Sequence, residues 1–315
     1  MAPYTLPSSA VWFITGCSSG IGYTLCHYLA THTQHRIVAT ARNVSTLTSL
    51  PSTPNILKVT LDVTSESSIH AAIAATLRKW HRIDIAVNNA GYGLHAHTEL
   101  VSPDCARKLM DTNFWSAVRI TQLLLPIMRD TNPLSGPRGG LFVQMSSGGG
   151  RQAFPGGAFY HTSKFALEGF SEALSKEVPE EWGIRVLIVE PGGVKTRYAE
   201  TSVKMAGEGE GEVGDDSVYA DPRLPANVLR AYVADPEARK NWAEVERVVE
   251  VLYKFVEKGG DMLLRLPLGS DSWAMQVEGA KASLEALEEL KEVSCSTSGE
   301  EQARSIAFLT GEIKR

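Results

Sequence analysis

The chain of 315 residues is long enough for one large α/β domain or for two domains of about 150 residues each. Hydrophobic residues make up 43% and charged residues 21%, which is typical of folded globular proteins and excludes collagen-like and wholly disordered chains. The 31 basic and 36 acidic side chains give a net charge of −5, without the basic excess that a phosphate backbone demands, so no nucleic-acid partner is expected.

Four cysteines, at positions 17, 26, 105 and 295, show neither a metal-binding spacing nor a disulfide pattern, so reduced thiols are expected. The N-terminal residues lack the basic region and apolar run of a signal peptide. No stretch approaches the ~18 to 20 apolar residues of a membrane span. These features predict a cytoplasmic protein without a membrane span.

Seven short apolar runs, none of which alternates polar and apolar residues, indicate parallel strands that are covered on both faces. They lie at residues 10–15, 36–41, 56–61, 84–89, 141–145, 184–190 and 262–268. Helical periodicity covers residues 23–30, 66–80, 103–128, 159–178, 242–256 and 272–293. Strands separated by helices predict an α/β fold with a Rossmann-type, doubly wound parallel sheet of about seven strands.

Three stretches interrupt this order. Residues 130–140 carry the turn-forming residues of a surface loop. Residues 201–226 contain EGEGEVGDD, which is too acidic and glycine-rich to pack, so a mobile segment is expected there. The helical pattern fades after Cys295, which predicts a single domain over 8–293 and a tail over 294–315.

The first strand runs into a glycine loop, Thr15 to Gly22, that a helical pattern follows. This order presents free backbone N–H groups and the positive end of a helix dipole to a pyrophosphate. Gly16 permits the turn, Gly20 lets the backbone approach a phosphate, and Gly22 lets the helix press on the strand. A glycine-rich turn without a ligand is the alternative interpretation.

Arg42 directly follows the second strand, 20 residues after Gly22. An acidic residue there would bind the 2′-hydroxyl of NAD, whereas an arginine accommodates the 2′-phosphate of NADP. No carboxylate occurs between His32 and Leu61, and Ser18 can add a hydroxyl to the same phosphate. The sequence therefore favours NADP(H) over NAD, with a solvated surface arginine as the alternative.

Tyr160 and Lys164 are four residues apart in a helical pattern, so they share a helix face. An adjacent ammonium stabilises a phenolate, so Lys164 is expected to lower the pKa of Tyr160 and to make it a usable general acid or base. Ser147 follows the fifth strand at the carboxyl edge of the sheet, where doubly wound sheets bind ligands. Its hydroxyl can orient a substrate oxygen there.

In chain order, these motifs resemble those of the short-chain dehydrogenase/reductase family. They are TGCSSGIG at 15–22, Asn88 to Gly91, Asn113, Ser147, Tyr160 with Lys164, and PGGVKT at 191–196. The resemblance covers residues 8–200 and extends more loosely to 293. The motifs TGCSSGIG, ATAR, NNAGYG and SKFALEGFSEAL are most similar to the 17β-hydroxysteroid and retinol dehydrogenase-like branch.

The resemblance implies a role for each matched residue. Tyr160 would exchange a proton with the substrate oxygen, Ser147 would hydrogen-bond that oxygen, and Lys164 would bind the nicotinamide ribose. Asn113 would hold a water that connects Lys164 to solvent, and the spacing to Tyr160 favours Ser147 over its neighbour Ser146. The implied cofactor-binding residues are Thr15, Gly16, Ser18, Ser19, Gly20, Ile21, Gly22, Arg42, Asp62, Val63, Asn89, Ala90, Gly91, Tyr160, Lys164, Pro191, Gly192, Val194 and Thr196.

The implied activity is that of an NADP(H)-dependent oxidoreductase that interconverts an alcohol and a ketone or aldehyde on a bulky hydrophobic substrate. Apolar side chains over 201–240 favour a lid on that substrate. A C=N or C=C reductase and a non-catalytic NADP-binding scaffold are the alternatives. Because two predicted helices are apolar on more than one face and family members often pair such helices, a homodimer or homotetramer is also predicted.

Three histidines receive weaker interpretations. His95 and His97 form an HxH pair, but a third metal ligand is not evident, so a pocket-lining or surface role is favoured over metal binding. His161 adjoins Tyr160 but faces about 100° away on a helix, which predicts a packing role rather than a base.

Overall fold

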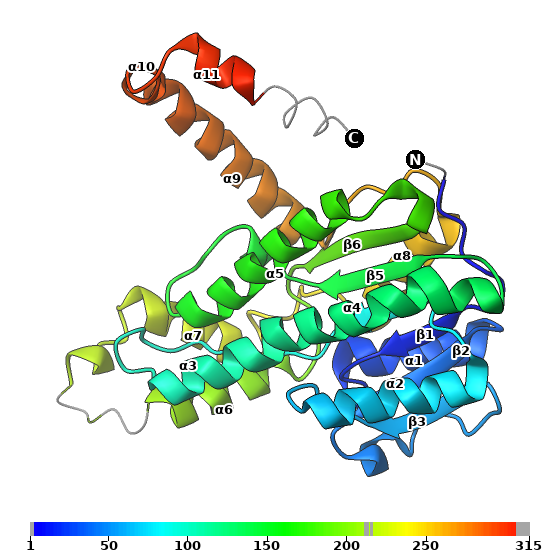
Figure 1. Cartoon of the computed structure of the whole chain (residues 1–315). Coiled ribbons are helices and arrows are strands. Elements are labelled where there is room, and N and C mark those ends of the chain that lie inside the picture. Colours follow the sequence, from blue (N-terminus) through cyan, green and yellow to red (C-terminus); the bar gives the residue numbers. More distant parts are fainter. Residues whose placement is uncertain (1–2, 211–213, 215–216, 307–315) are drawn as a thin grey trace. The chain divides into compact units, whose positions relative to one another are not determined.

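The computed structural model describes residues 3–210, 214 and 217–306. Seven strands form one sheet in the order β3-β2-β1-β4-β5-β6-β7, and every neighbouring pair is parallel (Figure 1). The strands are β1 (Val11–Ile14), β2 (Arg36–Ala41), β3 (Ile56–Thr60), β4 (Ile85–Asn88), β5 (Gly140–Met145), β6 (Ile184–Pro191) and β7 (Arg265–Leu268). The predicted doubly wound sheet of about seven strands is confirmed.

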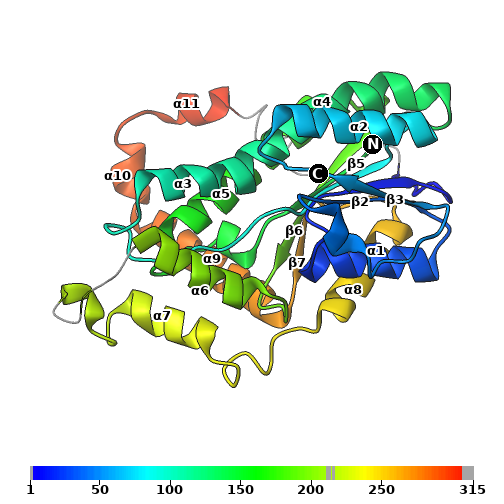
Figure 2. The same cartoon turned by 90° about the horizontal axis from the view of Figure 1, so that it is seen from below.

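Helices cover both faces of the sheet (Figure 2). The α-helices of the described residues are α1 (Gly20–His32), α2 (Glu66–Trp80), α3 (Pro103–Met110), α4 (Ser116–Pro126), α5 (Ala158–Glu177), α6 (Tyr198–Glu210), α7 (Pro225–Ala234), α8 (Val245–Lys258), α9 (Ser270–Glu289), α10 (Lys291–Cys295) and α11 (Glu300–Ser305). In β1, Trp12 and Ile14 enter the core on the side of α1 and α8, whereas Val11 and Phe13 enter the core on the side of α2 and α4. Both faces of the strand are therefore buried, which explains its unbroken apolar run.

The helix predicted over 103–128 is divided. A π-helical turn at Asp111–Trp115 separates α3 from α4, and a second at Ile127–Thr131 extends the end of α4. The i→i+5 hydrogen bonds of a π turn change the helical phase locally, and the hydrophobic periodicity of the sequence does not register this change.

The stretch 130–140 is a surface loop only in part, so that prediction is wrong for its first half. The chain stays helical through Leu134, and Asn132 is fully buried. The Asn132 amide donates to the Ile83 and Gly139 carbonyls at 2.8 Å each and accepts from the Ile83 amide at 3.1 Å. This buried side chain ties the start of β4 to the start of β5, and residues 134–138 are exposed.

The chain divides into two compact units, Met1–Trp273 and Ala274–Arg315. The first contains the whole sheet, while α9 begins in the first and continues into the second, which also contains α10 and α11. The expected boundary at 293 stays a prediction. Part of the expected tail is helical, since α11 lies within it, and residues 307–315 lie outside the described residues.

The acidic segment EGEGEVGDD is helical at its start, because α6 continues to Glu210. Its residues 211–213, 215 and 216 lie outside the described residues, so their expected mobility stays a prediction. Across the described parts of the chain, we find no helix with the combined length and apolar character needed to cross a membrane.

Candidate functional site

The candidate site lies where the strand order reverses. β1 pairs with β2 on one side and with β4 on the other, so the connections that follow β1 and β4 diverge at the carboxyl edge. Doubly wound sheets bind ligands at such a switch point. The parallel registers of β4, β5 and β6 bring the residues that follow each strand to this same edge.

The glycine loop is built so that a side chain would not fit. Gly16 has φ +71°, and a Cβ there would lie 2.9 Å from the Ala90 Cα. A Cβ on Gly22 would lie 2.6 Å from the Gly16 carbonyl oxygen, so α1 presses directly on the loop. The side chain of Ser19, the N-cap of α1, makes no capping hydrogen bond. The first N–H groups of α1 thus lack a side-chain cap, which suits a pyrophosphate.

Thr15 and Asn89 fasten this loop to the end of β4. The fully buried Thr15 hydroxyl accepts from the amides of Asn89 at 2.9 Å and Ala90 at 3.0 Å. The Asn89 side chain donates to the Thr15 carbonyl at 2.8 Å. Because the polar groups of both side chains form hydrogen bonds within the protein, these two residues position the glycine loop.

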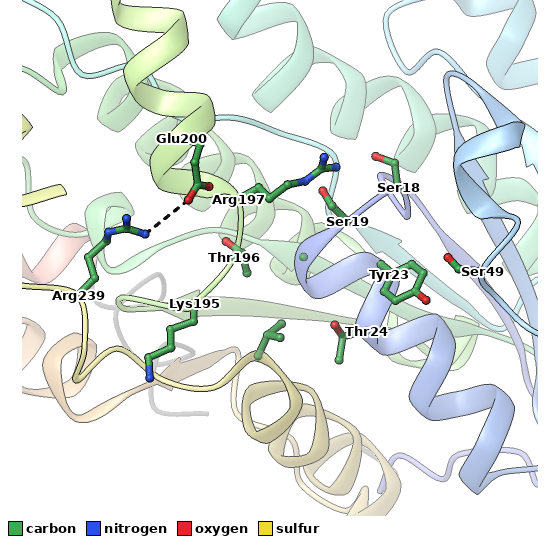
Figure 3. A pocket seen from close by; sticks show the side chains of 12 residues that line it. Ser18, Ser19, Tyr23, Thr24, Ser49, Lys195, Thr196, Arg197, Glu200 and Arg239 are labelled. Carbon is green, nitrogen blue, oxygen red and sulfur yellow. Dashed lines mark ion pairs between the residues drawn. The ribbon is translucent and has the colours of Figure 1, made fainter. Parts of the chain in front are cut away.

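An open pocket of about 580 Å³ lies between the glycine loop, α1 and the segment that follows β6 (Figure 3). Its lining residues are Ser18, Ser19, Gly20, Tyr23, Thr24, Ser49, Lys195, Thr196, Arg197, Glu200, Arg239 and Val245. In Figure 3, Arg197 extends toward Ser18 and Ser19. The predicted phosphate loop and predicted Thr196 thus meet, and a Cβ on Gly20 would touch the Thr196 methyl at 3.4 Å.

Three cations of this pocket were not predicted as site residues. Lys195 pairs with Glu244 at 2.5 Å, and Arg239 lies 3.8 Å from Glu200. Arg197 directly follows the predicted PGGVKT motif, but the sequence does not reveal that this segment turns back onto the glycine loop. The hydroxyls, the uncapped N–H groups of α1 and the guanidinium of Arg197 together fit a dinucleotide pyrophosphate.

The segment after β6 is held in place by its neighbours. A Cβ on Gly192 would lie 2.1 Å from the Asp271 carboxylate, which accepts from the Gly193 amide at 2.7 Å. Val194 is buried and forms a parallel bridge with Ala243. Pro191 to Thr196 therefore forms a fixed wall beside the glycine loop.

Arg42 and Asp62 lie at the adjacent carboxyl ends of β2 and β3. Arg42 is exposed. Hydrogen bonds from the Thr64 amide and hydroxyl lower the pKa of the Asp62 carboxyl, and the nearby Arg42 charge lowers it further. The two predicted residues are thus brought together, with the Asp62 carboxylate engaged by Thr64. Val63, which follows, is buried.

The predicted catalytic residues converge beside this loop. Tyr160 and Lys164 lie on the buried face of α5, and the Lys164 Nζ is 5.9 Å from the centre of the Tyr160 ring. The Lys164 ammonium donates to the Met145 carbonyl, at the end of β5, at 2.8 Å. The Ser147 hydroxyl is close enough to Tyr160 to lower its pKa, whereas Ser146 is buried against Gly150.

The pKa of Tyr160 differs from the expectation. Burial raises it above its ordinary value, and hydrogen bonds with Ser147 and Tyr198 offset this only in part. Burial also lowers the pKa of Lys164 to about 8, against the opposing charge of Glu168 one turn along. The expected lowering of the Tyr160 pKa by Lys164 is therefore not found, because desolvation of the phenol is the largest effect.

Asn113 occupies the π-helical turn between α3 and α4. Its amide accepts from the Tyr92 amide at 3.0 Å and donates to the Tyr92 carbonyl at 2.9 Å and to the Ser163 hydroxyl at 3.1 Å. A Cβ on Gly91 would lie 3.0 Å from the Asn113 Oδ1 and 3.7 Å from the Lys164 Nζ. Asn113, Gly91 and Lys164 therefore pack closely, and π turns are frequent at functional sites.

Sequence reasoning interpreted Tyr198, the first residue of α6, as an apolar contact of the lid and did not place it beside the catalytic tyrosine. The Tyr198 hydroxyl lies 3.1 Å from the Nε2 of His95, which therefore lines the site. The Nε2 of His97 lies 3.0 Å from the Asn227 Oδ1, so the two histidines contact different residues. The buried His161 donates to the Gly149 carbonyl at 2.8 Å, which agrees with a packing role. Among the described residues, no group of three or more His, Cys, Asp or Glu side chains suits a metal ion.

Comparisons with known proteins identify the family to which the chain is similar. A family model for short chain dehydrogenase matches residues 10–207. Oxidoreductase calM of Penicillium decumbens is 38% identical over 296 residues, which cover 93% of this chain and 94% of that protein. Retinol dehydrogenase 8 of Bos taurus is 32% identical over 225 residues, covering 68% and 69%. A short-chain dehydrogenase structure from Streptomyces avermitilis has a TM-score of 0.75 and 28% identity, covering 93% of this chain and 100% of that chain.

Proposed function

The chain belongs to the short-chain dehydrogenase family, in its retinol dehydrogenase-like branch, and on that premise we propose that it is an NADP(H)-dependent oxidoreductase. It interconverts an alcohol and a ketone or aldehyde on a bulky hydrophobic substrate. The observation that carries this proposal is the meeting of Ser147, Tyr160 and Lys164 beside the glycine loop, at the carboxyl edge of the sheet.

In this proposal, a nicotinamide held at that edge supplies or accepts the hydride. Tyr160 protonates the substrate oxygen during reduction and takes the proton back during oxidation. Ser147 orients that oxygen, and Lys164 holds the nicotinamide ribose. Asn113 fixes the loop around Gly91 next to the Lys164 ammonium, from which the proton is exchanged with solvent.

The apolar surroundings of Tyr160 support a bulky hydrophobic substrate. A separate apolar cluster joins Tyr160 to the loop after β4, to α3 and to α6; its buried members include Leu94, Leu109 and Ala206. A retinol dehydrogenase, named for an apolar alcohol, is among the similar proteins. Apolar pockets with a few polar groups at the reacting end are typical of such sites.

Tyr160→Phe tests the proposal. We expect NADPH affinity to stay within twofold and turnover of lipophilic ketones and aldehydes to fall by about 10²- to 10⁴-fold, since the general acid is lost. Tyr232→Phe, on the exposed part of α7, is the matched control and should keep full turnover. Retained turnover in Tyr160→Phe would contradict the assigned acid.

Two alternatives have distinct outcomes in the same assays. NADPH binding without turnover across ketones, steroids, retinoids and polyketides would favour a non-catalytic scaffold. Product identification would reveal a C=N or C=C reductase. The intact set of Asn113, Ser147, Tyr160 and Lys164 favours catalysis, because a binding scaffold has no use for an acid/base pair. The cytoplasmic location stays a prediction.

A further inference from the structure

Tyr198 lies against the catalytic tyrosine although α6 belongs to the lid region of the chain. The centres of the Tyr160 and Tyr198 rings are 5.8 Å apart. Gly93 makes room for this approach, because a Cβ there would lie 2.7 Å from the Tyr198 ring. The hydroxyls of Ser147 and Tyr198 both act on the Tyr160 hydroxyl and lower its pKa. The Tyr160 oxygen therefore has a partner from the β5 edge and another from α6.

The neighbours of the Tyr198 hydroxyl indicate which phenol donates. Burial raises the pKa of both phenols, and their mutual hydrogen bond raises the pKa of Tyr198 further while it lowers that of Tyr160. These directions agree with Tyr198 as the donor and Tyr160 as the acceptor. Ser202, on the same helix, also acts on the Tyr198 hydroxyl and lowers its pKa. The Tyr198 oxygen then serves as an acceptor, and its own proton is the one available to Tyr160.

His95 supplies the matching donor. Burial lowers its pKa to about 4, and His161 and Arg230 act in the same direction, so the ring is neutral at pH 7 and carries one proton. Its Nδ1 is buried and, within the described part of the chain, has no hydrogen-bond partner, while its Nε2 lies 3.1 Å from the Tyr198 hydroxyl. A buried N–H without a partner is costly, so the proton is placed on Nε2.

We infer that Tyr198 is a positioning residue for the catalytic tyrosine: held by His95, it donates a hydrogen bond from α6 to the Tyr160 oxygen. This inference rests on the proposed function and deepens it. A phenolate gains more from accepted hydrogen bonds than a phenol does. The readiness of Tyr160 to release its proton therefore depends on α6 being seated over the site.

The titratable and charged groups that face this pair come from three elements. Lys164 and His161 belong to α5 beside Tyr160, His95 to the loop after β4, and Arg230 to α7, from which it acts on His95. His95 stays neutral above a pH of about 5, since its pKa is about 4. Burial lowers the pKa of Lys164 to about 8, so this neighbour titrates within the working range of pH and each variant below retains it.

Tyr198→Phe removes the donor and keeps the ring. The ionisation of Tyr160 is read from tyrosinate absorbance as the difference between each enzyme and the same enzyme carrying Tyr160→Phe. We expect about a tenfold smaller ionisation constant for Tyr160 in Tyr198→Phe, from the loss of one hydrogen bond to a charged oxygen, with NADPH affinity unchanged. The pH profile of turnover should move to higher pH by the same amount.

Tyr219→Phe is the control, because Tyr219 is another tyrosine of the lid region whose hydroxyl bonds to Glu99, away from Tyr160. An unchanged Tyr160 ionisation constant in Tyr198→Phe, or an equal change in Tyr219→Phe, would overturn the inference. If Tyr198→Phe does not fold, His95→Phe replaces it in this experiment. A smaller Tyr160 ionisation constant in His95→Phe supports the inference, and an unchanged constant overturns it. The tyrosinate absorbance is measured without substrate. A failure of this inference can therefore be distinguished from a failure of the proposed enzyme activity.

Discussion

Arg42 is the residue on which the predicted choice of cofactor depends. It is exposed at the end of β2 and close enough to Asp62 to act on that carboxyl. We expect Arg42→Ala to weaken NADPH binding by about tenfold to a hundredfold, because a charged hydrogen bond contributes about 1.5–3 kcal/mol. NADH binding should be unchanged, since NADH has no 2′-phosphate. Cofactor fluorescence titration measures both dissociation constants.

Arg36→Ala is the matched control for this measurement, because Arg36 begins β2 and lies at the opposite end of the strand. Its two dissociation constants should equal those of the unaltered protein. Equal losses of NADPH and NADH affinity in Arg42→Ala would point to general damage at the edge of the sheet. Unaltered NADPH affinity would leave Arg42 a solvated surface arginine.

At the scale of single residues, the sequence predicts those that follow strands or share a helix face. Ser147 and Tyr160 meet because a strand end and a helix are ordered by the parallel sheet. His95 and Tyr198 are separated by 103 residues and meet only because α6 folds over the loop after β4. No local pattern encodes that meeting, and the raised pKa of Tyr160 likewise follows from tertiary burial.

The contact between α1 and the glycine loop gives a prediction for two helical glycines. A methyl on Gly22 would meet the Asn89 side chain and the Gly16 carbonyl oxygen at 2.6 Å, whereas one on Gly169, in α5, would meet nothing within 4 Å. We expect Gly22→Ala to lower the free energy of unfolding by about 1–3 kcal/mol through overpacking. Gly169→Ala should raise it by about 0.5–1 kcal/mol through better helix propensity.

Urea denaturation of both variants measures the two free energies, and NADPH titration adds a functional readout. Gly22→Ala should also weaken NADPH binding, because the loop must shift, and Gly169→Ala should not. A change of the free energy of unfolding in the same direction for both variants would contradict the prediction. Close packing of α1 on the loop would then not explain why position 22 is a glycine.

At the scale of elements, apolar runs predict strands to within a few residues because both faces of this sheet are covered. The hydrophobic pattern does not predict the backbone conformation where hydrogen bonds from particular side chains determine it. The π turn around Asn113 coincides with three amide hydrogen bonds, and the helical extension to Leu134 places Asn132 between two strands. Such interactions depend on distant partners, which a window along the sequence does not contain.

For the whole molecule, the strand order follows from simple rules. Consecutive parallel strands joined by right-handed crossovers produce β1-β2-β3 on one side, and the return to β4 beside β1 creates the ligand-binding edge. The sequence therefore predicts the place of the site together with the fold. It does not predict a division at Trp273, because the helical pattern of α9 runs through that position without a break.

Two large aromatic side chains on the surface of the first unit lead to a prediction about assembly. Trp115 is 46% exposed on the π turn before α4, and Phe165 is 45% exposed on α5, which packs against that turn. Exposed apolar groups on neighbouring helices are typical of interfaces between symmetric copies. We therefore expect light scattering to give two or four times the mass of one chain for the unaltered protein.

Trp115→Glu and Phe165→Glu should each lower that mass to that of a single chain, because a carboxylate would be buried without a partner in the interface. Leu134→Glu is the matched control: Leu134 is 85% exposed in the turn after α4, and its substitution should leave the mass unchanged. NADPH binding in all three variants verifies that the sheet and glycine loop remain folded. A single-chain mass for the unaltered protein at every concentration would contradict the assembly, and a mass unchanged in both helix variants would place the interface on another surface.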